Sequence, residues 1–393
     1  MPLLPQHGIT RMLTYDYIII GAGASGLMLA DALGKDPYFS DRSILLLDKS
    51  QNRTNDRTWC FWEMGKGEFD DLIYKSWDHI HVSDKTYSKK TPIAPYKYKM
   101  LRATEFYHDL DSKIKKYANI SFLEGSVTAL EDKGTAVLVQ TNTDTYKGKQ
   151  VFSSIFNYKE LINQKKYPVL QQHFIGWFVK TPQPTFDADQ ATFMDFSIPQ
   201  KGNTRFMYVL PFSKTEALVE YTLFSEHPLP VSEYEAAIAD YLLTKMDCHD
   251  YEIIHKESGN IPMSCYNFNT KNSKNILHIG IAGGWAKPSS GYTFKRTRQK
   301  IRQLIPFLKS GLPLNNFAKK NRFWFYDLLL LDILQRDNSK GHLIFGTLFK
   351  NRDPQSIFKF LDEKSSLIED IKVIAACPKK EFILALLRRV FSF

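Results

Sequence analysis

The sequence of 393 residues lacks the patterns that are typical of metal-binding, disulfide-rich, secreted and membrane-spanning proteins. Its four cysteines are scattered without a C-x-x-C pair, so neither a zinc site nor a disulfide framework is indicated, and we expect no bound metal. No run of about 18 apolar residues could span a bilayer, and residues 1–13 lack the apolar core of a signal peptide. Internal repeats and low-complexity tracts are also missing. These absences favour a large globular protein of a reducing compartment, which we expect to be cytoplasmic.

The charge is unbalanced, with 52 Lys and Arg against 42 Asp and Glu and a net charge of +10. Such an excess is typical of proteins that meet nucleic acid or an anionic membrane surface. No nucleic-acid-binding motif is present, and the basic residues adjoin apolar and aromatic runs at 295–302, 319–322 and 379–389. This pattern favours a membrane surface as the partner, with no nucleic acid. For 295–302, a solvated helix face is the equal alternative.

A glycine-rich turn near the N-terminus is the most specific pattern in the chain. Residues 17–27, Y-I-I-I-G-A-G-A-S-G-L, run from an apolar strand through G-x-G-x-x-G into a helix. Gly21 permits the tight turn, Gly23 lets backbone N–H groups approach a pyrophosphate, and Gly26 allows close packing of the helix. A second apolar strand ends in Asp48, about 20 residues after Gly26, where a ribose-binding carboxylate is expected. This order of elements predicts a dinucleotide site.

The position of this unit at the start of the chain favours FAD, because flavoproteins commonly open with it and return to the flavin later. A second glycine-rich turn is present at 276–285, I-L-H-I-G-I-A-G-G-W, followed by P-S-S-G-Y at 288–292 and a long helical pattern. We expect this turn to contribute to the same site. A plain strand-to-helix turn is the alternative.

The middle of the chain is rich in aromatic and β-branched residues separated by turn residues, which predicts strands. These segments are 174–179, 191–196, 205–211 and 217–224, and we expect them to form an antiparallel sheet inserted between the two flavin segments. Capping boxes S-x-x-E at Ser232 and Ser366 predict helices over 232–246 and 366–376.

The predicted fold class is therefore α/β: an FAD-binding Rossmann-like domain of the glutathione-reductase type, an inserted antiparallel-sheet substrate domain and a helical C-terminal region. We expect the FAD domain over 15–160 and 255–310, the sheet domain over 161–254 and the helical region over 311–393. The segment from Pro378 onward is an apolar helix flanked by Lys and Arg, too short to span a bilayer. It suits an interfacial anchor, although a helix docked on the core would have the same pattern.

Glu220 is the candidate catalytic residue. Strand alternation places it on one face with Leu218, Thr222 and Phe224, beside a preceding strand full of aromatics. Burial there would raise the pKa of its carboxyl, as a general acid near neutral pH requires. An edge-strand glutamate that points to water is the alternative.

Together these motifs resemble the flavoprotein lycopene cyclase family, in particular its bacterial beta-cyclase branch. The resemblance covers most of the chain and includes N-D-R-T-W-C-F-W at 55–62, L-P-F-S at 210–213, L-V-E-Y-T at 218–222 and the segment 283–292. The family has an acidic pair followed by Thr at the position of Glu220, and the second acid is Tyr221 here. That departure puts a role for a second carboxylate in doubt.

The resemblance implies an isomerase of carotenoid biosynthesis that cyclises the ψ-ends of lycopene to β-rings, giving gamma- and beta-carotene. A proton at C2 would start a carbocation cyclisation without net redox, and loss of a proton would set the ring type. The family further implies that reduced FAD is required, with NAD(P)H as reductant, at the inner face of the cell membrane. The expected FAD contacts are Gly21, Gly23, Ala24, Gly26, Asp48, Lys49, Arg57, Thr58, Trp59, Gly280, Gly283, Gly284, Ser290, Gly291 and Tyr292.

Three other functions fit the same patterns. A flavin monooxygenase or hydroxylase and a prenyl-chain reductase would act on a hydrophobic isoprenoid and consume reducing equivalents. A non-enzymatic, flavin-binding peripheral membrane protein belongs to a different class.

Overall fold

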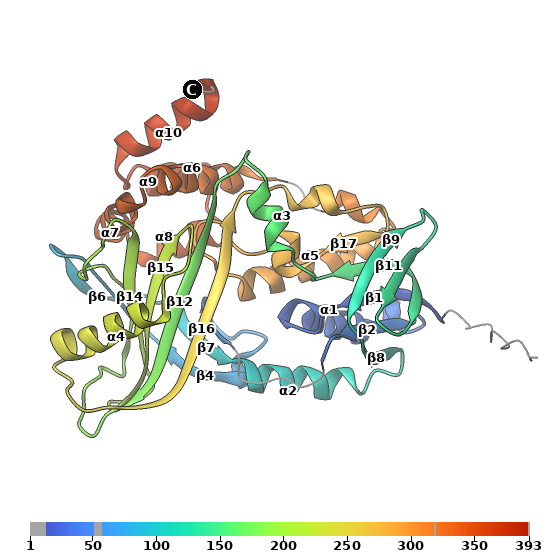
Figure 1. Ribbon diagram of the computed structural model, residues 1–393, viewed down its shortest axis with the longest axis horizontal. Helices are drawn as coiled ribbons and strands as arrows, with labels where there is room; N and C mark the ends of the chain where they lie inside the picture. The colour runs from blue at the N-terminus through green and yellow to red at the C-terminus, as the bar shows by residue number, and fades with distance from the viewer. Residues whose placement is uncertain (1–12, 51–56, 318–319, 392–393) are drawn as a thin grey trace, which may run out of the picture.

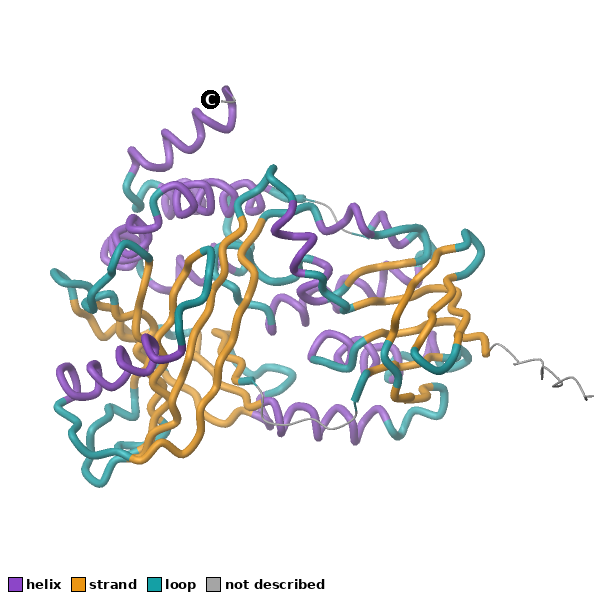
Figure 2. The backbone as a smooth tube through the Cα atoms, viewed as in Figure 1, coloured by secondary structure: helices purple, strands orange, loops and turns teal. Residues whose placement is uncertain are grey.

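The computed structural model describes residues 13–50, 57–317 and 320–391, which form three sheets and the helices that cover them (Figures 1 and 2). The N-terminal part of the segment 55–62 and the basic residue at 319 lie outside the described residues. The strands are β1 Leu13–Ile20, β2 Ile44–Asp48, β3 Thr58–Met64, β4 Ile73–Trp77, β5 His79–Ser83, β6 Ser88–Pro92, β7 Tyr96–Arg102, β8 Ile120–Glu124, β9 Val127–Asp132, β10 Val137–Thr141, β11 Thr145–Ser153, β12 Val169–Lys180, β13 Gln190–Asp195, β14 Thr204–Pro211, β15 Glu216–Ser225, β16 Glu252–Ser264 and β17 Ile276–His278. The helices are α1 Ala24–Gly34, α2 Ala103–Ile114, α3 Tyr158–Asn163, α4 Val231–Met246, α5 Phe294–Lys309, α6 Arg322–Arg336, α7 Gly341–Asn351, α8 Pro354–Leu361, α9 Leu367–Ile374 and α10 Lys379–Phe391.

The first sheet has the order β8-β2-β1-β11-β10-β9, and β17 pairs with β11. Strands β8, β2, β1, β11 and β17 are parallel, whereas β9 and β10 continue the sheet in antiparallel fashion. The second half of β1, residues 18–20, and β2 up to Leu47 are apolar and buried, as expected for parallel strands covered on both faces. Helices α1, α2 and α5 pack together beside this sheet. The predicted α/β class and its Rossmann-like unit are confirmed.

The second sheet has the order β16-β12-β15-β14-β13-β5-β6 and lies at the opposite end of the molecule in Figure 1. Its central strands are antiparallel, as predicted, and only the β13–β5 pair is parallel. The sheet uses more of the chain than residues 161–254: β5 and β6 come from the N-terminal part, and β16 extends it to Ser264. The sequence of β6, S-K-K-T-P, has no strand-like alternation of apolar residues, so sequence patterns gave no sign of this edge.

Each face of the second sheet packs against different helices. Along β15, Val219, Tyr221 and Leu223 pack with residues of α4, whereas Leu218 and Phe224 pack with residues of α6, α7 and α8. This is the strand alternation that the sequence predicted. The third sheet, β3-β7-β4, contributes Trp62, Trp77 and Tyr98 to the same core as α6 to α8.

One of the two predicted helix starts is correct. Ser366 and Glu369 form the capping box that begins α9. The box predicted at Ser232 is wrong, because α4 begins one residue earlier, at Val231, and has Pro230 as its N-cap. The Glu235 side chain pairs with Lys256 of the neighbouring strand, so it is engaged in a tertiary contact.

The basic residues of α5 form ion pairs inside the molecule. Lys295 pairs with Asp362 at 2.6 Å, and Arg302 pairs with Glu68 at 3.0 Å. Arg296 and Arg298 likewise pair with glutamates, Glu363 and Glu63. The largely buried Lys295, Arg296 and Arg298 contradict both sequence interpretations of 295–302, a lipid-facing cluster and a solvated helix face, whereas Arg302 is mostly exposed and fits the solvated face. The three buried pairs link α5 to β3 and to the segment that follows α8.

Candidate functional site

The turn between β1 and α1 has the geometry of a dinucleotide-binding loop. Gly21 has φ +92° and donates its N–H to Leu47 O at 2.7 Å, which ties the loop to the end of β2. At Gly26 a Cβ would lie 1.9 Å from Gly21 O, so only glycine allows the helix this close. At Gly23, in contrast, a Cβ would meet no protein atom within 4 Å. The open space at Gly23 is where the backbone can approach a ligand.

Polar groups around this turn suit an anionic nucleotide. The N-terminus of α1 has no side-chain cap and no acidic residue in its first turn, so its N–H groups are free of such partners and can donate hydrogen bonds to a phosphate. Asp48, at the end of β2, accepts hydrogen bonds from Ala22 N and Ser50 N. The carboxylate predicted to bind ribose therefore stands against the glycine turn. Lys49 follows it and is exposed.

The second glycine turn joins the first, as predicted. Its strand, β17, runs parallel to β11, and the short 3-10 helix η4, Gly280–Gly283, follows it. Gly280 has φ +60°, and a Cβ there would lie 2.7 Å from Ser25 Oγ, so the turn packs against the start of α1. Gly283 and Gly284 shape the turn: a Cβ on Gly283 would lie 2.2 Å from His278 O, and Gly284 has φ +69°.

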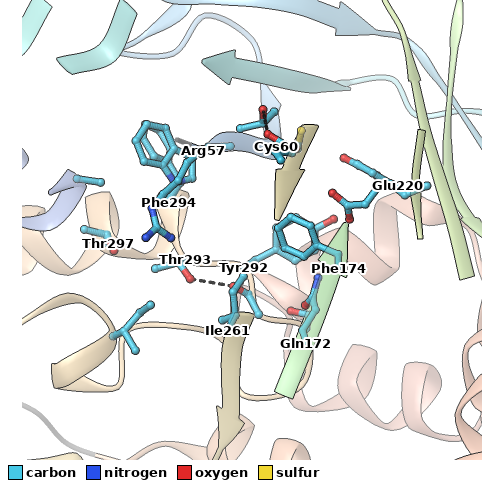
Figure 3. Close-up of a pocket in the computed structure, with 18 of the residues that line it drawn as sticks. Arg57, Cys60, Gln172, Phe174, Glu220, Ile261, Tyr292, Thr293, Phe294 and Thr297 are labelled. Atoms are coloured by element: carbon cyan, nitrogen blue, oxygen red, sulfur yellow. Dashed lines mark hydrogen bonds between the residues drawn. The ribbon is translucent and has the colours of Figure 1, made fainter. Parts of the chain in front are cut away.

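A cavity of about 370 Å³ connects these turns with the second sheet (Figure 3). In Figure 3 the side chain of Glu220 points toward the same space as Phe174 and Tyr292, and Arg57 lies on the other side, near Phe294. The predicted site residues that line the cavity are Gly23, Ala24, Arg57, Thr58, Trp59, Glu220, Gly280, Ser290, Gly291 and Tyr292. Those that do not line it are Gly21, Gly26, Asp48, Lys49, Gly283 and Gly284.

Two buried polar atoms in the cavity wall suggest that a polar ligand completes the site. Gln172 Oε1 and Ser290 Oγ are buried, and neither has a hydrogen-bond partner among the described residues. Gly291, with φ +68°, carries the chain close to Gln172, since a Cβ there would lie 2.3 Å from its Oε1. Unpaired buried polar atoms are costly without a partner. These atoms, together with the open loop at Gly23, fit the polar edge and the phosphates of a flavin dinucleotide.

Glu220 is buried, with 8% of its surface exposed, so the alternative of an edge glutamate in water is wrong. It lies in β15 between Tyr208 of β14 and Gly176 of β12, and Thr222 Oγ1 donates a hydrogen bond to its Oε1 at 2.5 Å. Burial, with a smaller contribution from the charge of Glu257, raises the pKa of the Glu220 carboxyl to about 8. Glu220 is therefore protonated at neutral pH.

The sequence analysis missed Glu257, a second buried carboxyl that also lines this cavity. It lies in β16 opposite Gly176 and accepts a 2.7 Å hydrogen bond from Thr58 Oγ1. Burial raises the pKa of Glu257 to about 7, against the Thr58 hydrogen bond and the nearby charge of Arg102. No sequence signal was available, because β16 contains Gly259, Pro262 and several charged residues that mask its strand character.

The remaining wall is mostly aromatic. Tyr98 hydrogen-bonds Tyr208 at 2.5 Å and Tyr292 at 3.0 Å, which fixes these three rings relative to one another. The cavity is also lined by Phe174, Phe193, Phe206, Leu218 and Phe224. Burial keeps the Cys60 thiol neutral by raising its pKa. The site thus combines a protonated carboxyl with an apolar, π-rich surround, which can protonate an apolar molecule and stabilise a carbocation.

Comparisons with known proteins agree with this geometry. Residues 16–387 match the family model described as lycopene cyclase protein. The chain belongs to the lycopene cyclase family. It is also 22% identical, over 298 residues, to the lycopene beta-cyclase of Paracoccus sp., covering 73% of this chain and 72% of the relative.

Solved structures share the fold. A geranylgeranyl bacteriochlorophyll reductase-like protein from Thermoplasma acidophilum has a TM-score of 0.58 at 12% identity, covering 96% of both chains. A halogenase solved with phloroglucinol and FAD has a TM-score of 0.58 at 13% identity, covering 95% of this chain and 86% of its own. The chain therefore has the fold of FAD-dependent flavoproteins.

Proposed function

We propose that this protein is a lycopene beta-cyclase, which converts the ψ-ends of lycopene to β-rings and so forms gamma- and beta-carotene. The observation that carries the proposal is Glu220, a protonated carboxyl buried in an aromatic cavity that reaches the dinucleotide loop. An acid in such a place suits the protonation of an alkene, a very weak base that cannot compete with water. Membership of the lycopene cyclase family gives the substrate class.

In this reaction the neutral Glu220 gives its proton to C2 of a ψ-end. Because Oε1 already accepts a hydrogen bond from Thr222, we place the proton on Oε2. The positive charge then forms at C1, and the C5–C6 double bond attacks C1 to close a six-membered ring. Aromatic residues that line the cavity, among them Phe174, Phe206 and Phe224, would stabilise the cation and keep water from capturing it. Loss of a proton from C6 gives the β-ring.

FAD would bind with its pyrophosphate at Gly23 and the start of α1, its ribose at Asp48 and its flavin toward Gln172 and Ser290. When bound in its reduced form, FAD would supply negative charge close to the developing carbocation. NAD(P)H would serve only to reduce the flavin, because ring formation itself consumes no electrons.

The amount of NADPH consumed per product molecule distinguishes this proposal from the other flavoprotein functions. Pigments from a lycopene-accumulating bacterial host that expresses the protein should contain gamma- and beta-carotene. With purified protein, the number of rings formed should far exceed the NADPH oxidised once the flavin is reduced. One NADPH per product would favour a monooxygenase or a prenyl-chain reductase. A flavin-loaded protein that leaves lycopene unchanged would favour the non-enzymatic alternative.

We also propose that the protein meets a membrane surface through α9 and α10, at the inner face of the cell membrane. The two helices lie at the upper edge of Figure 1, and no helix within the described residues is long and apolar enough to cross a bilayer. In α9, Ile368 and Ile371 are 68% and 65% exposed. In α10, Ala385 is buried against the core and Arg389 pairs with Asp332 of α6, while several apolar side chains remain exposed: Ile383, Leu387, Val390 and Phe391. Such a face suits a lipid interface and access to an apolar substrate.

A further inference from the structure

The cyclisation needs a proton acceptor as well as a donor. After ring closure the cation at C5 is quenched when C6 loses its proton, and the base that removes this proton decides the ring type. Once the ring has closed, C2 and C6 are both bonded to C1, so the donor and the acceptor must stand close together in the cavity. We propose that Glu257 is this acceptor, the second catalytic carboxyl of the cavity, an inference that rests on the proposed function.

The strand register brings the two glutamates together. Gly176 of β12 lies opposite Glu220 on one side and opposite Glu257 on the other, so all three share one face of the sheet. A Cβ on Gly176 would lie 3.5 Å from Glu220 Cβ and 3.5 Å from Glu257 Cγ. Because glycine has no side chain, both glutamate side chains reach the space over it, which they share with Leu218 Cδ1, 2.7 Å from where the Cβ would lie. Both line the cavity, and 9% of Glu257 is exposed.

The family's usual second acid could not take this place here. Position 221 is on the opposite face of β15, where the Tyr221 ring packs against α4 and its hydroxyl accepts a 3.0 Å hydrogen bond from Arg205. A carboxylate at 221 in the same strand register would point away from the cavity. Tyr221 replaces the family's second acid, and in this chain Glu257 of β16 supplies the second carboxyl of the cavity instead.

The surroundings assign different roles to the two carboxyls. Glu257 accepts a hydrogen bond from Thr58 and lies within the field of Arg102, both of which favour its ionised form. Glu220 has the hydrogen bond from Thr222 but no cation among the described residues acts on it, and the charge of Glu257 opposes its ionisation. When the pair holds a single proton, that proton belongs on Glu220. The singly protonated pair thus has its acid and its base in place.

The protons and electrons balance over one ring. The O–H bond of Glu220 breaks and a C2–H bond forms with the electrons of the C1–C2 double bond. The electrons of the C5–C6 double bond then form the C1–C6 bond. Finally, the C6–H bond breaks, its electrons restore the C5–C6 double bond, and the proton goes to Glu257. Transfer of that proton from Glu257 to Glu220 restores the starting state with no oxidant or reductant.

The groups that face the pair do not titrate with it. Burial raises the pKa values of the nearby Cys60, Tyr98, Tyr208 and Tyr292, so all four are neutral near pH 7. Arg102 is the cation near Glu257. A pH profile measured between about 5 and 9 with reduced FAD therefore reports on the two glutamates once it is corrected for protonation of the reduced flavin itself, which its absorbance shows over the same pH range.

The test compares pH profiles of lycopene cyclisation by the wild type, Glu257→Gln and Glu257→Asp, each loaded with reduced FAD. The activity of the wild type should follow a bell-shaped curve against pH, because turnover needs one proton on the pair. Activity should fall at low pH as Glu257 becomes protonated (the acid limb) and at high pH as Glu220 loses its proton. Glu257→Gln should lose roughly 100-fold in turnover, the lower range for a general base, and should lose the acid limb of the bell. Glu257→Asp should keep both limbs and more activity than the Gln variant. Glu252→Gln, on an exposed residue of the same strand, should match the wild type.

The order of the two variants separates catalysis from structure. If Glu257 only anchors Thr58, the Gln side chain, equal in length and still an acceptor, should be the better replacement, and both limbs should remain. That result would overturn the inference. Should Glu257→Gln fail to retain FAD, an acid limb at the same pH in Glu257→Asp as in the wild type would contradict the inference, and a shifted acid limb would support it. A wild type that forms no rings in any condition would instead refute the proposed function.

Discussion

The dinucleotide loop and the acid-bearing face of the second sheet are two halves of one cavity, built in different ways. The loop is made by β1, α1 and β2, a short continuous stretch whose function depends on backbone groups and on three glycines. The acid-bearing face is made by β14, β15, β12 and β16, whose order in the sheet differs from their order in the chain. Its function depends on side chains that meet only after folding.

This difference predicts how each half responds to substitution. Substitutions in the loop should lower the affinity for FAD and leave the fold intact, because they fill the space or disturb the backbone groups that would contact the nucleotide. Substitutions of the glutamates on the sheet face should change the pH dependence of activity and stability and leave FAD binding intact. A loop variant that changes the pH dependence, or a sheet variant that loses FAD, would contradict this distinction.

The largest loop effect is expected from Gly23→Val. No protein atom lies within 4 Å of a Cβ at this position, so the chain should fold, but the side chain would occupy the space of the pyrophosphate. We expect FAD affinity to fall by roughly 100-fold or more, about 2.7 kcal/mol. Titration of the apoprotein with FAD, followed by flavin fluorescence, measures this. Gly125→Ala is the matched control, since a Cβ there makes only ordinary contacts, starting at 3.5 Å. Equal affinities in both variants would refute the loop assignment.

On the sheet face, Glu220→Gln should change the pH dependence of stability. The folded-state pKa of Glu220, about 8, lies above its ordinary value of 4.5, so the folded protein holds this proton more tightly than the unfolded chain. Its contribution to stability is full below pH 4.5 and is lost as the pH rises through 8. The free energy of unfolding of Glu220→Gln, relative to the wild type, should therefore rise between pH 5 and pH 9 by on the order of 4 kcal/mol.

Urea unfolding at several pH values measures this difference. Glu252→Gln, on an exposed residue, should show a difference from the wild type that does not vary with pH. A Glu220→Gln curve parallel to that of the wild type would mean that the Glu220 carboxyl is ionised in the folded protein.

A smaller loop effect is expected from Asp48→Ala. The substitution removes the acceptor for Ala22 N and the expected ribose partner, so FAD affinity should fall by about tenfold, or 1.4 kcal/mol. Asp16→Ala is a matched control, because Asp16 also links β1 to the residue before β2, through Ser43 N at 2.9 Å, but at the other end of the strands. If the two variants bind FAD equally, Asp48 does not contact the nucleotide.

The smallest effect is expected outside the cavity. Ile368→Asn with Ile371→Asn should weaken sedimentation with anionic liposomes about threefold to tenfold, since the two exposed isoleucines together contribute on the order of 1 kcal/mol of apolar burial at a lipid surface. Ile254→Asn, 57% exposed on β16, is the control. High salt should weaken the wild-type association by screening. Unchanged sedimentation of the α9 variant would place the membrane contact elsewhere.

The two halves also differ in how far sequence could predict them. The loop follows from local rules: Gly21, Gly23 and Gly26 stand where the turn needs them, and Asp48 stands at the end of the next strand. On the sheet face, alternation along β15 was sufficient to find Glu220. Glu257 could not be found, because its proximity to Glu220 depends on the order of strands and on the register across β12.

The contacts of charged side chains at the surface were the hardest feature to predict from the sequence. The basic residues of α5 looked free in sequence, and their acidic partners lie far away along the chain, as Lys295 and Asp362 illustrate. The start of α4 was misplaced because S-x-x-E is also found inside helices, where Glu235 serves a tertiary ion pair. Local patterns identify what a segment can do, and long-range contacts decide which of those options is used.

The most direct test of the account is turnover by Glu220→Gln in D2O with chemically reduced FAD. We expect the variant to retain the fold and FAD while cyclising lycopene at least 100-fold more slowly, the lower range for loss of a general acid. In the wild type each ring should carry one deuterium at C2, with no continuing oxidation of NADPH. Near-wild-type turnover by Glu220→Gln, or one NADPH consumed for every ring, would contradict the account.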